Sequence, residues 1–366
     1  MPAEDDRRWM RLALSLGRRG LGNVWPNPAV GCVIVRDGRV LGRGWTRPGG
    51  RPHAERVALN EAGPAAAGAT AYVSLEPCNH TGLTPPCSEA LVAAGLARVV
   101  VAVADPDPRT AGGGIARLEA AGIDVECGLL AEEALRDHAG FFARIVTGRP
   151  YLALKLASTL DGRIATATGE SRWITGPMAR HWVHGQRLAY DAVMVGAGTA
   201  RQDDPMLTVR GYGEVPQPVR IVLSRRLDLP RAGRLAASAR DVPLWLLHGR
   251  EAPEAARAAW RDTGARLIEV PSVAEGQVDL AAALAALGKA GLTRVFCEGG
   301  GTLAAALLAS DLADELSVVT AGAAIGAEGV PGVGAMGVAS LSEAPRFRLA
   351  ETRSLGGDVL SRWTRR

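Results

Sequence analysis

Residues 69–103 read ATAYVSLEPCNHTGLTPPCSEALVAAGLARVVVAV and contain one complete strand–helix–strand unit. The apolar runs at 69–75 and 97–103 have the length of buried strands, and the segment 87–95 has the apolar spacing of a helix. Two strands separated by a helix are typical of a parallel sheet that is covered by helices. The stretch therefore predicts an α/β domain, with cysteines in the loop that leaves its first strand.

The flanking segments extend this pattern in both directions. An amphipathic helix opens the chain, and residues 29–45 read as two strands joined by a tight turn at Asp37-Gly38. Residues 53–63 have helical spacing, and a helix, a strand and a helix are expected after the quoted stretch, at 113–122, 123–127 and 131–146. We expect a mostly parallel sheet in this half of the chain.

A second α/β domain is expected after a short linker. The chain has 366 residues, more than the roughly 100–200 of one domain, and Thr147-Gly148-Arg149-Pro150 has the Gly/Pro content of a connection. We place the domains at 1–147 and 148–366. The second half alternates again and ends in strand-rich sequence; its apolar segments are 151–158, 191–198, 219–224, 243–248, 265–270 and 293–301.

Composition excludes several classes of protein. Hydrophobic residues make up 47% and charged residues 22%, and no run of about 18 apolar residues could span a membrane. The opening MPAEDDRRWM is acidic where a secretory signal would be basic, and five scattered cysteines do not form a disulfide framework. We expect a cytoplasmic protein that binds no membrane.

The basic character of the chain does not indicate nucleic-acid binding. Its isoelectric point is about 9.0, but the net charge is only +4 and no basic run with interleaved aromatics occurs. Nearly all basic residues are Arg, with Lys only at Lys155 and Lys289. We expect a coding bias and no nucleic-acid partner, with some arginines holding a phosphorylated small molecule.

His53, Cys78 and Cys87 form a candidate metal site. Three N and S ligands are what a catalytic zinc takes, with its fourth position left open for water. A closed structural site would need a fourth ligand, for which His80 stays open, and a disulfide is the other alternative.

Glu55 gives this site a hydrolytic character. It lies two positions after His53, close enough to reach a water on the metal without being a ligand. Zinc lowers the pKa of such a water to about 7. A carboxylate beside it can pass the proton of the water to a leaving amine, as in the zinc nucleobase deaminases.

The first half resembles a known family. The motifs PNPAVGCVIV, GRPHAE, AYVSLEPCNHTGLTPPC and ADPDPRTAGGG look like the deaminase half of the bifunctional riboflavin-biosynthesis deaminase/reductases. The eight residues between the cysteines favour this family over nucleic-acid deaminases, whose cysteines are usually two residues apart. The resemblance implies a cytidine-deaminase-like three-layer α/β/α domain. It also implies zinc at His53, Cys78 and Cys87, Glu55 as catalytic proton carrier, and Asn27 as a substrate contact.

The second half resembles the reductase half of the same family. The motifs are LKLASTLDGRIA, GESRWITG, VGAGTARQDDPMLTVR and CEGGGTLAAALL, and the last has a glycine run before a helix, where phosphate binds. The resemblance implies a dihydrofolate-reductase-like α/β domain that uses NADPH, and a homo-oligomer, dimer or tetramer. The implied cofactor-binding residues are Ala157, Trp173, Thr199, Asp203 and a loop of Gly300, Gly301, Thr302, Leu303 and Ala304. The implied substrate-binding residues are Ser171, Arg187, Leu207, Arg210 and Glu298.

Some of these positions have plainer interpretations. Trp173 alone would be read as core packing, Asp203 as part of a turn or cap, and Arg187 as a solvated helix position. The chain also departs from the family, with Thr46 where the family often has His and Ser224-Arg225 where it commonly has Asp-Ser. We hypothesise that Arg225 pairs with the 2′-phosphate of NADPH.

The combined expectation is a two-step enzyme. The first domain would deaminate 2,5-diamino-6-(5-phosphoribosylamino)pyrimidin-4(3H)-one to 5-amino-6-(5-phosphoribosylamino)uracil, and the second would reduce the ribosyl to a ribityl side chain with NADPH. Two alternatives stay open: a nucleic-acid base deaminase with an accessory domain, and a zinc-stabilised binding protein without activity.

Overall fold

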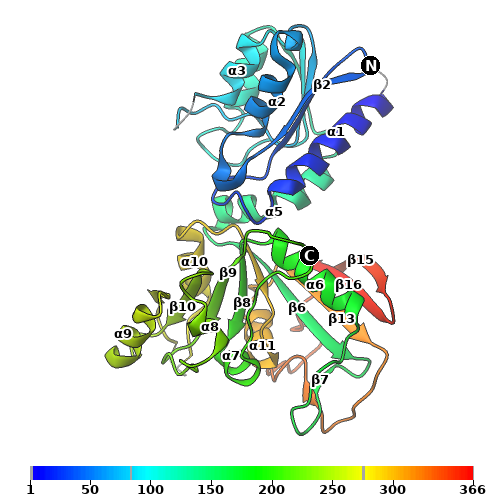
Figure 1. The fold of residues 1–366 in the computed structure, drawn as a ribbon. Coiled ribbons are helices and arrows are strands. Elements are labelled where there is room, and N and C mark those ends of the chain that lie inside the picture. The colour runs from blue at the N-terminus through cyan, green and yellow to red at the C-terminus, as the bar shows by residue number, and fades with distance from the viewer. Residues whose placement is uncertain (1–2, 83–84, 274–276, 366) are drawn as a thin grey trace. The chain divides into compact units, whose positions relative to one another are not determined.

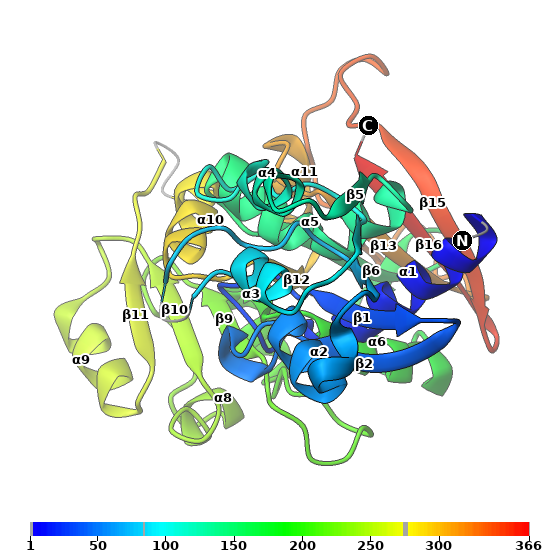
Figure 2. The same ribbon diagram turned by 90° about the horizontal axis from the view of Figure 1, so that it is seen from above.

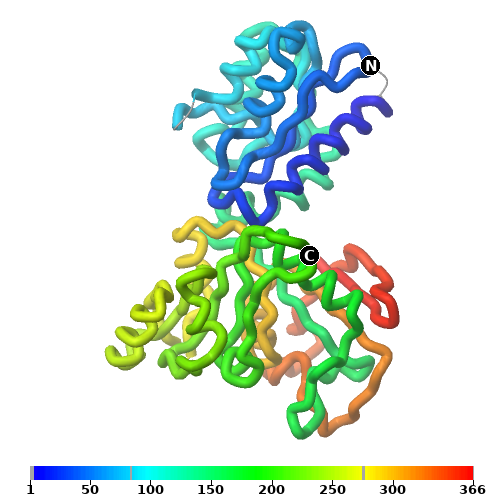
Figure 3. The backbone as a smooth tube through the Cα atoms, viewed as in Figure 1, coloured from blue at the N-terminus to red at the C-terminus, as the bar shows by residue number. Residues whose placement is uncertain are grey.

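The computed structural model describes residues 3–82, 85–273 and 277–365. The chain forms two compact units, Met1–Gly148 and Arg149–Arg366, and Figure 3 follows the backbone through each of them. The first unit ends with helix α5 (Ala131–Thr147), whose C-terminus is closed by Gly148 in the left-handed conformation at φ 73°. Glycine is favoured there because a side chain would be strained at positive φ.

The first unit contains a five-stranded sheet in the order β2-β1-β3-β4-β5. Its strands are β1 (Gly31–Arg36), β2 (Arg39–Trp45), β3 (Thr70–Val73), β4 (Arg98–Val101) and β5 (Asp124–Cys127). The edge strand β2 is labelled in Figure 1. Strands β3, β4 and β5 are parallel, whereas β1 is antiparallel to both of its neighbours. The expectation of a mostly parallel sheet is therefore wrong, because β1 pairs antiparallel both with β2 in the predicted hairpin and with β3.

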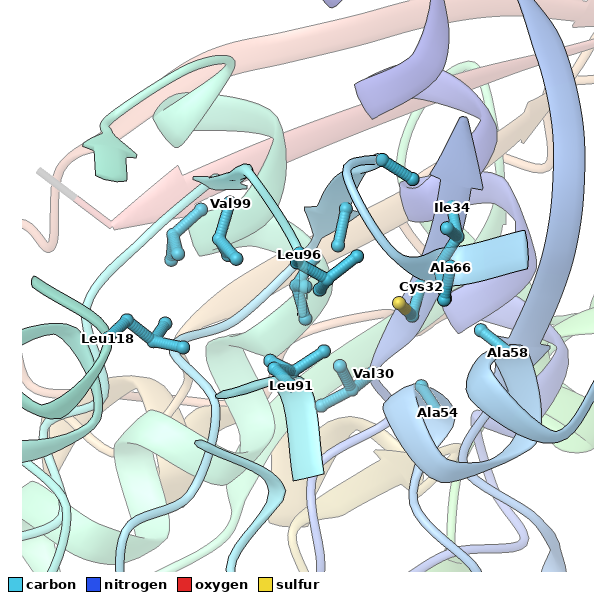
Figure 4. Close-up of a cluster of buried hydrophobic side chains, with 14 of the residues drawn as sticks. Val30, Cys32, Ile34, Ala54, Ala58, Ala66, Leu91, Leu96, Val99 and Leu118 are labelled. Carbon is cyan, nitrogen blue, oxygen red and sulfur yellow. The ribbon is translucent and has the colours of Figure 1, made fainter. Parts of the chain in front are cut away.

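Helices cover both faces of this sheet, as expected for three layers. The alternate residues of β1 show this: Cys32 and Ile34 belong to one buried cluster, and Val33 and Val35 to another. Helix α1 contributes to the second cluster, and α2, α3 and α4 to the first, which Figure 4 shows in close-up. The helices are α1 (Ala3–Gly17), α2 (Ala54–Ala62), α3 (Cys87–Ala93) and α4 (Gly113–Ala120).

The second unit contains a nine-stranded sheet in the order β11-β10-β9-β8-β12-β6-β13-β16-β15. Pairing is parallel from β11 to β13, and β16 and β15 add antiparallel strands at one edge. All six segments expected as strands form strands. The strands are β6 (Tyr151–Thr159), β8 (Ala192–Gly196), β9 (Val219–Leu223), β10 (Leu244–His248), β11 (Arg266–Glu269), β12 (Arg294–Cys297), β13 (Glu315–Ala321), β15 (Phe347–Leu355) and β16 (Asp358–Arg365).

Helices alternate with strands along this unit, and Figure 2 labels several of them from above. The helices are α6 (Pro177–Ala189), α7 (Ala197–Asp203), α8 (Arg234–Ala237), α9 (Glu254–Asp262), α10 (Leu280–Lys289) and α11 (Gly301–Ala309). A separate ribbon of β7 (Arg163–Ala165) and β14 (Val330–Pro331) was not expected from the sequence. Helices α7 and α11 follow β8 and β12 directly, so their N-termini lie at the carboxyl edge of the sheet, where α/β folds bind ligands.

No helix in the described part of the chain has the length and apolar character needed to cross a bilayer.

Candidate functional site

The three predicted metal ligands converge from three segments of the first unit. His53 is the residue before α2, Cys78 lies in the loop after β3, and Cys87 is the first residue of α3. Their ligand atoms all lie within 4.8 Å of one another, and His53 Nδ1 is 3.5 Å from Cys78 Sγ and 3.4 Å from Cys87 Sγ. Tetrahedral zinc with ordinary Zn–N and Zn–S bonds separates N from S by about 3.6 Å. The donor set therefore fits zinc.

Glu55 lies beside these ligands in the first turn of α2. Its side chain is only 3% exposed, and Oε2 has no hydrogen-bond partner among the described residues. Burial raises the pKa of Glu55 to about 7. A buried carboxylate oxygen without a partner is costly, so this atom indicates a position for a ligand or water.

Backbone packing fixes the start of α2. A Cβ on Gly44 in β2 would lie 2.2 Å from the carbonyl oxygen of Ala54, so only glycine lets the strand and the helix approach this closely. Ala54 stands between His53 and Glu55, and the close contact therefore sets where both side chains begin.

Glu76 holds the loop that carries Cys78, a role that the sequence reasoning missed. Its carboxylate accepts hydrogen bonds from the backbone N–H groups of Asp105, Gly112, Gly114 and Ile115, at 2.9–3.2 Å. A Cβ on Gly114 would lie 2.0 Å from the carbonyl oxygen of Pro77, which explains a glycine there. The ADPDPRTAGGG motif thus wraps around one carboxylate. The signal in the sequence was an acidic residue, Glu76, directly after the apolar segment 69–75.

Two alternatives for this site do not match the geometry. Cys78 and Cys87 are both free thiols, so the disulfide is absent between these described residues. His80 lies outside the three-residue group, and its Nδ1 is 3.3 Å from Thr110 Oγ1. The structure gives no support to His80 as a fourth ligand.

A cavity of about 570 Å³ opens onto the metal ligands His53 and Cys78 and onto Glu55. Asn27, expected as a substrate contact, lines it together with Thr46 and His80. Thr46 is buried, and its Oγ1 accepts a hydrogen bond of 3.0 Å from the backbone N–H of Val30. Thr46 therefore tethers the wall of the cavity. Besides Glu55, the acidic and arginine residues of the lining are Arg51, Glu76, Asp105, Asp107, Arg109 and Arg144.

The second unit has its own cavity, of about 330 Å³, at the carboxyl edge of the sheet. It brings together most of the residues that the sequence implied for the reductase. Those in its lining are Ala157, Ser171, Trp173, Arg187, Thr199, Asp203, Arg210, Glu298 and Gly300.

The segment 300–304 is the start of a helix, whereas the sequence reasoning took it as a loop. Gly300 is the N-terminal cap of α11, and the N–H of Ala304 already donates to its carbonyl oxygen at 3.0 Å. A Cβ on Gly301 would lie 2.6 Å from the carbonyl oxygen of Pro331, so this glycine permits a close backbone contact. The N–H groups at the start of α11 meet the cavity at Gly300, which fits the phosphates of a dinucleotide.

Five of the implied residues are not among the described residues that line this cavity. Leu207 is 2% exposed, and Ala304 is fully buried. The others, at the start of α11, are Gly301, Thr302 and Leu303.

Arg187 and Glu298 form a buried ion pair in the wall of the cavity. The Arg187 Nε and Nη2 atoms donate to the two carboxylate oxygens of Glu298 at 2.6 and 3.0 Å, and Nη1 donates to the Thr208 carbonyl at 2.8 Å. The two side chains are only 12% and 11% exposed. The interpretation of Arg187 as a solvated position is therefore wrong.

Lys155 also lines this cavity and was missed as a site residue. Burial lowers the pKa of its ammonium, an effect that the carboxylate of Glu298 opposes. The signal was available, because Lys155 interrupts an otherwise apolar strand and the chain has only one other lysine.

Trp173 and Arg225 also differ from simple expectations. Trp173 is 68% exposed, with the Arg180 guanidinium 4.7 Å from its ring centroid, so the interpretation of Trp173 as core packing is wrong.

The Arg225 Nη1 atom donates to Glu251 at 3.3 Å, and Arg225 is not among the described residues of the cavity lining. The buried Ser224 donates from Oγ to Asp228 at 3.0 Å.

Comparison with known proteins agrees with two domains that each have their own site. The family model of the cytidine and deoxycytidylate deaminase zinc-binding region matches residues 3–103, and the model of the RibD C-terminal domain matches residues 150–361. The riboflavin biosynthesis protein RibD of Escherichia coli K12 is 41% identical over 97% of this chain and 98% of its own length. That of Aquifex aeolicus is 38% identical over 98% of both chains.

Solved structures show the same similarity. Acinetobacter baumannii RibD has a TM-score of 0.88 and 38% identity, and the match covers 100% of this chain and 99% of that one. A Thermotoga maritima protein described as a diaminohydroxyphosphoribosylaminopyrimidine deaminase/5-amino-6-(5-phosphoribosylamino)uracil reductase has a TM-score of 0.87 and 32% identity over the full length of both chains. The chain therefore belongs to the RibD family of riboflavin biosynthesis proteins.

Proposed function

We propose that the two domains carry out successive steps on one phosphoribosylated pyrimidine. The first deaminates 2,5-diamino-6-(5-phosphoribosylamino)pyrimidin-4(3H)-one to 5-amino-6-(5-phosphoribosylamino)uracil, and the second reduces the ribosyl to a ribityl side chain. The observation that carries the proposal is the buried, partnerless Oε2 of Glu55 beside the ligand atoms of His53, Cys78 and Cys87. A purely structural zinc site has no use for that carboxylate.

In the deaminase cavity, His53, Cys78 and Cys87 would hold zinc, which acts there as a Lewis acid and makes water a nucleophile at neutral pH. Glu55 accepts a proton from the water that adds to C2 of the pyrimidine and delivers it to the amine, which leaves as ammonia. A pKa of about 7 suits a group that must both take and give a proton near neutrality. Asn27, which lines the same cavity, orients the pyrimidine.

In the reductase cavity, NADPH would supply a hydride to C1′ of the ring-opened ribose. The backbone N–H of Gly300 and the side chains of Thr199 and Asp203 bind the cofactor, and Trp173 covers it. Ser171 and Arg210 hold the phosphoribosyl group. These reductase residues orient the cofactor and the substrate and balance their charges.

Two buried charges complete the reductase site. Glu298, held by Arg187, binds the substrate through the part of its carboxylate that faces the cavity. Lys155 holds a proton on Nζ beside Glu298 and can donate it to the nitrogen attached to C1′. Gly301, Thr302, Leu303, Ala304 and Leu207 then support the site through the backbone.

The products test this proposal directly. Zinc-loaded protein and the diaminopyrimidine substrate should give the uracil compound without NADPH and the ribitylamino compound with it, identified by mass spectrometry. If the substrate is recovered unchanged from a protein with a full complement of zinc, the proposed deaminase activity is wrong.

We also propose that the protein works in the cytoplasm as a homodimer or homotetramer. All five cysteines are free thiols, which suits a reducing compartment. Strand β15 is an edge of the nine-stranded sheet and offers a surface for a second copy. Light scattering coupled to gel filtration tests the assembly, and a monomer at micromolar concentration would contradict it.

A further inference from the structure

A short segment before β9, residues 208–212, is attached to helix α6 at three points. The side chains of α6 that hold it are spaced three residues apart, so each is a neighbour of the next on the helix surface. In the segment, every second residue is held. The three pairs are His181 with Tyr212, His184 with Arg210, and Arg187 with Thr208.

The two outer contacts fix the ends of this segment. His181 and Tyr212 stack with their ring centroids 4.6 Å apart, and the Tyr212 hydroxyl donates to the His181 carbonyl at 3.3 Å. A Cβ on Gly185 would lie 2.7 Å from that hydroxyl, so a glycine in α6 leaves room for the tyrosine. At the other end, Arg187 donates from Nη1 to the Thr208 carbonyl at 2.8 Å.

The central contact joins the segment to the reductase cavity. The backbone N–H of Arg210 donates to His184 Nδ1 at 3.2 Å. Both residues line the cavity, and the His184 side chain is partly buried there. Nδ1 accepts a hydrogen bond only when the imidazole is neutral and carries its proton on Nε2. The contact therefore requires one charge state and one tautomer of His184.

Arg210 depends on its backbone for its position. The residue is exposed, so packing does not hold its side chain. On one side of it, the buried Leu207 has φ 55°, a conformation that persists only where the surrounding structure holds it. On the other side, Gly211 has φ 80°. Without the His184 contact, the backbone between these two bends could carry the Arg210 guanidinium away from the cavity.

The surroundings of His184 favour the neutral ring. Burial lowers the pKa of His184, and the cations Arg187 and Arg210 lower it further. The carboxylate of Glu298 and the carbonyl of Thr208 oppose this, but the net shift is downward. The other charged residues of the described lining are Lys155 on β6, Arg180 on α6 and Asp203 at the end of α7. His184 is therefore mostly neutral at pH 7 and takes up a proton as the pH falls.

We propose that neutral His184 is a positioning residue of the reductase, which holds the backbone of Arg210 against α6 and so keeps the Arg210 guanidinium at the substrate. Protonation of His184 places a donor opposite the Arg210 N–H and releases the middle of the segment. The inference rests on the proposed reductase function and deepens it, because it makes substrate affinity depend on pH. Hydride transfer stays with the cofactor.

NADPH oxidation by the full-length protein, with 5-amino-6-(5-phosphoribosylamino)uracil as substrate, tests this role. His184→Leu leaves the Arg210 N–H without an acceptor, so KM for the uracil compound should rise by about 5- to 50-fold at about pH 8. His184→Asn places a carbonyl oxygen near the position of Nδ1 and should keep KM close to that of the wild type. In both variants kcat and KM for NADPH should change little.

The acid side of the pH profile separates a positioning role from simple packing. The phosphate of the substrate also titrates near pH 6, so the effect is read as the ratio of the wild-type KM to that of His184→Asn. This ratio should rise by about fivefold or more from about pH 8 to about pH 5, because only the wild type loses its acceptor.

His181→Phe is the matched control for the second histidine of α6. It keeps a ring against Tyr212 and removes a titrating group, so its KM should rise in acid as that of the wild type does. The proposal is overturned if the ratio stays constant, if His184→Leu keeps the wild-type KM, or if His181→Phe abolishes the acid rise.

Two measurements without substrate separate this proposal from the reductase function itself. Nitrogen NMR of the imidazole rings, with His184 identified by its absence in His184→Asn, should place the proton on Nε2 at about pH 8. Hydrogen exchange of the backbone at residues 208–212 should be faster in His184→Leu than in the wild type or His184→Asn. If both results hold but the wild type oxidises no NADPH, the proposed reduction fails while the role of His184 stands. A proton on Nδ1, or equal exchange in all three proteins, would overturn that role.

Discussion

The two cavities of this protein differ in where their chemistry resides. In the first, the reacting groups belong to the chain: three metal ligands meet within 4.8 Å, and a buried carboxylate oxygen beside them has no described partner. In the second, the chain offers a helix N-terminus, an ion pair and a lysine, which position a cofactor that does the chemistry. Replacing any one side chain of the first site should therefore abolish its activity. Replacing one side chain of the second site should reduce its activity only in part.

Glu55→Gln should have the largest effect. The amide keeps the shape of the side chain but cannot accept and return a proton, so ammonia release should fall by about 10²- to 10⁴-fold. Zinc content, measured by elemental analysis, should be unchanged. NADPH oxidation with 5-amino-6-(5-phosphoribosylamino)uracil as substrate should continue at the wild-type rate. Near-normal ammonia release would show that Glu55 is not the proton carrier.

Arg187→Met should weaken the second domain. It leaves the buried Glu298 carboxylate without its partner, and breaking a buried pair costs about 3–5 kcal/mol of folding free energy. Thermal unfolding should show a lower Tm for the second domain, and NADPH oxidation should fall while ammonia release persists.

The double variant Arg187→Met/Glu298→Met is the matched control for that loss. It removes both charges, so it should recover much of the stability but not the reductase activity. Equal destabilisation in the single and double variants would contradict the ion-pair account.

The pH dependence of reduction should report on Lys155. Burial lowers the pKa of its ammonium below the usual 10.5, so the proton donor is lost as pH rises through this lowered pKa. Above it, kcat/KM for NADPH oxidation should fall by about tenfold per pH unit. Lys155→Arg stays charged and should remove this alkaline limb. A limb that persists in Lys155→Arg belongs to another group.

Arg225→Ala should have the smallest effect. Arg225 is 38% exposed and paired with Glu251, so any pairing with the 2′-phosphate of NADPH would be shared and screened. We expect KM for NADPH to rise about two- to fivefold, and KM for NADH to change less. An equal change for both cofactors would refute the hypothesis.

The first site could be predicted from the sequence because its chemistry is local. His53 and Glu55 lie two residues apart at a helix start, and Cys78 and Cys87 bracket one loop, so strand and helix patterns were enough to bring them together. Glu76 was missed because its partners are backbone N–H groups of residues 105–115, which have no side-chain signature.

The second site could be assigned only through family resemblance. Arg187 and Glu298 are 111 residues apart, and their pairing depends on the order of strands in a nine-stranded sheet, which no local pattern fixes. The same limit explains the first sheet. The hairpin of β1 and β2 was predicted from its turn residues, but the antiparallel pairing of β1 with β3 depends on tertiary packing. The start of α11 at Gly301 was missed because a glycine run favours a loop by propensity.

The most direct test of the two-site account is a time course with the diaminopyrimidine substrate in which ammonia and NADPH oxidation are followed separately. Ammonia should appear at the same rate with and without NADPH. NADPH oxidation should begin only after a lag, as deaminated intermediate accumulates, and should reach one equivalent per ammonia. NADPH consumption that precedes ammonia, or ammonia release that is never followed by NADPH consumption, would contradict the account.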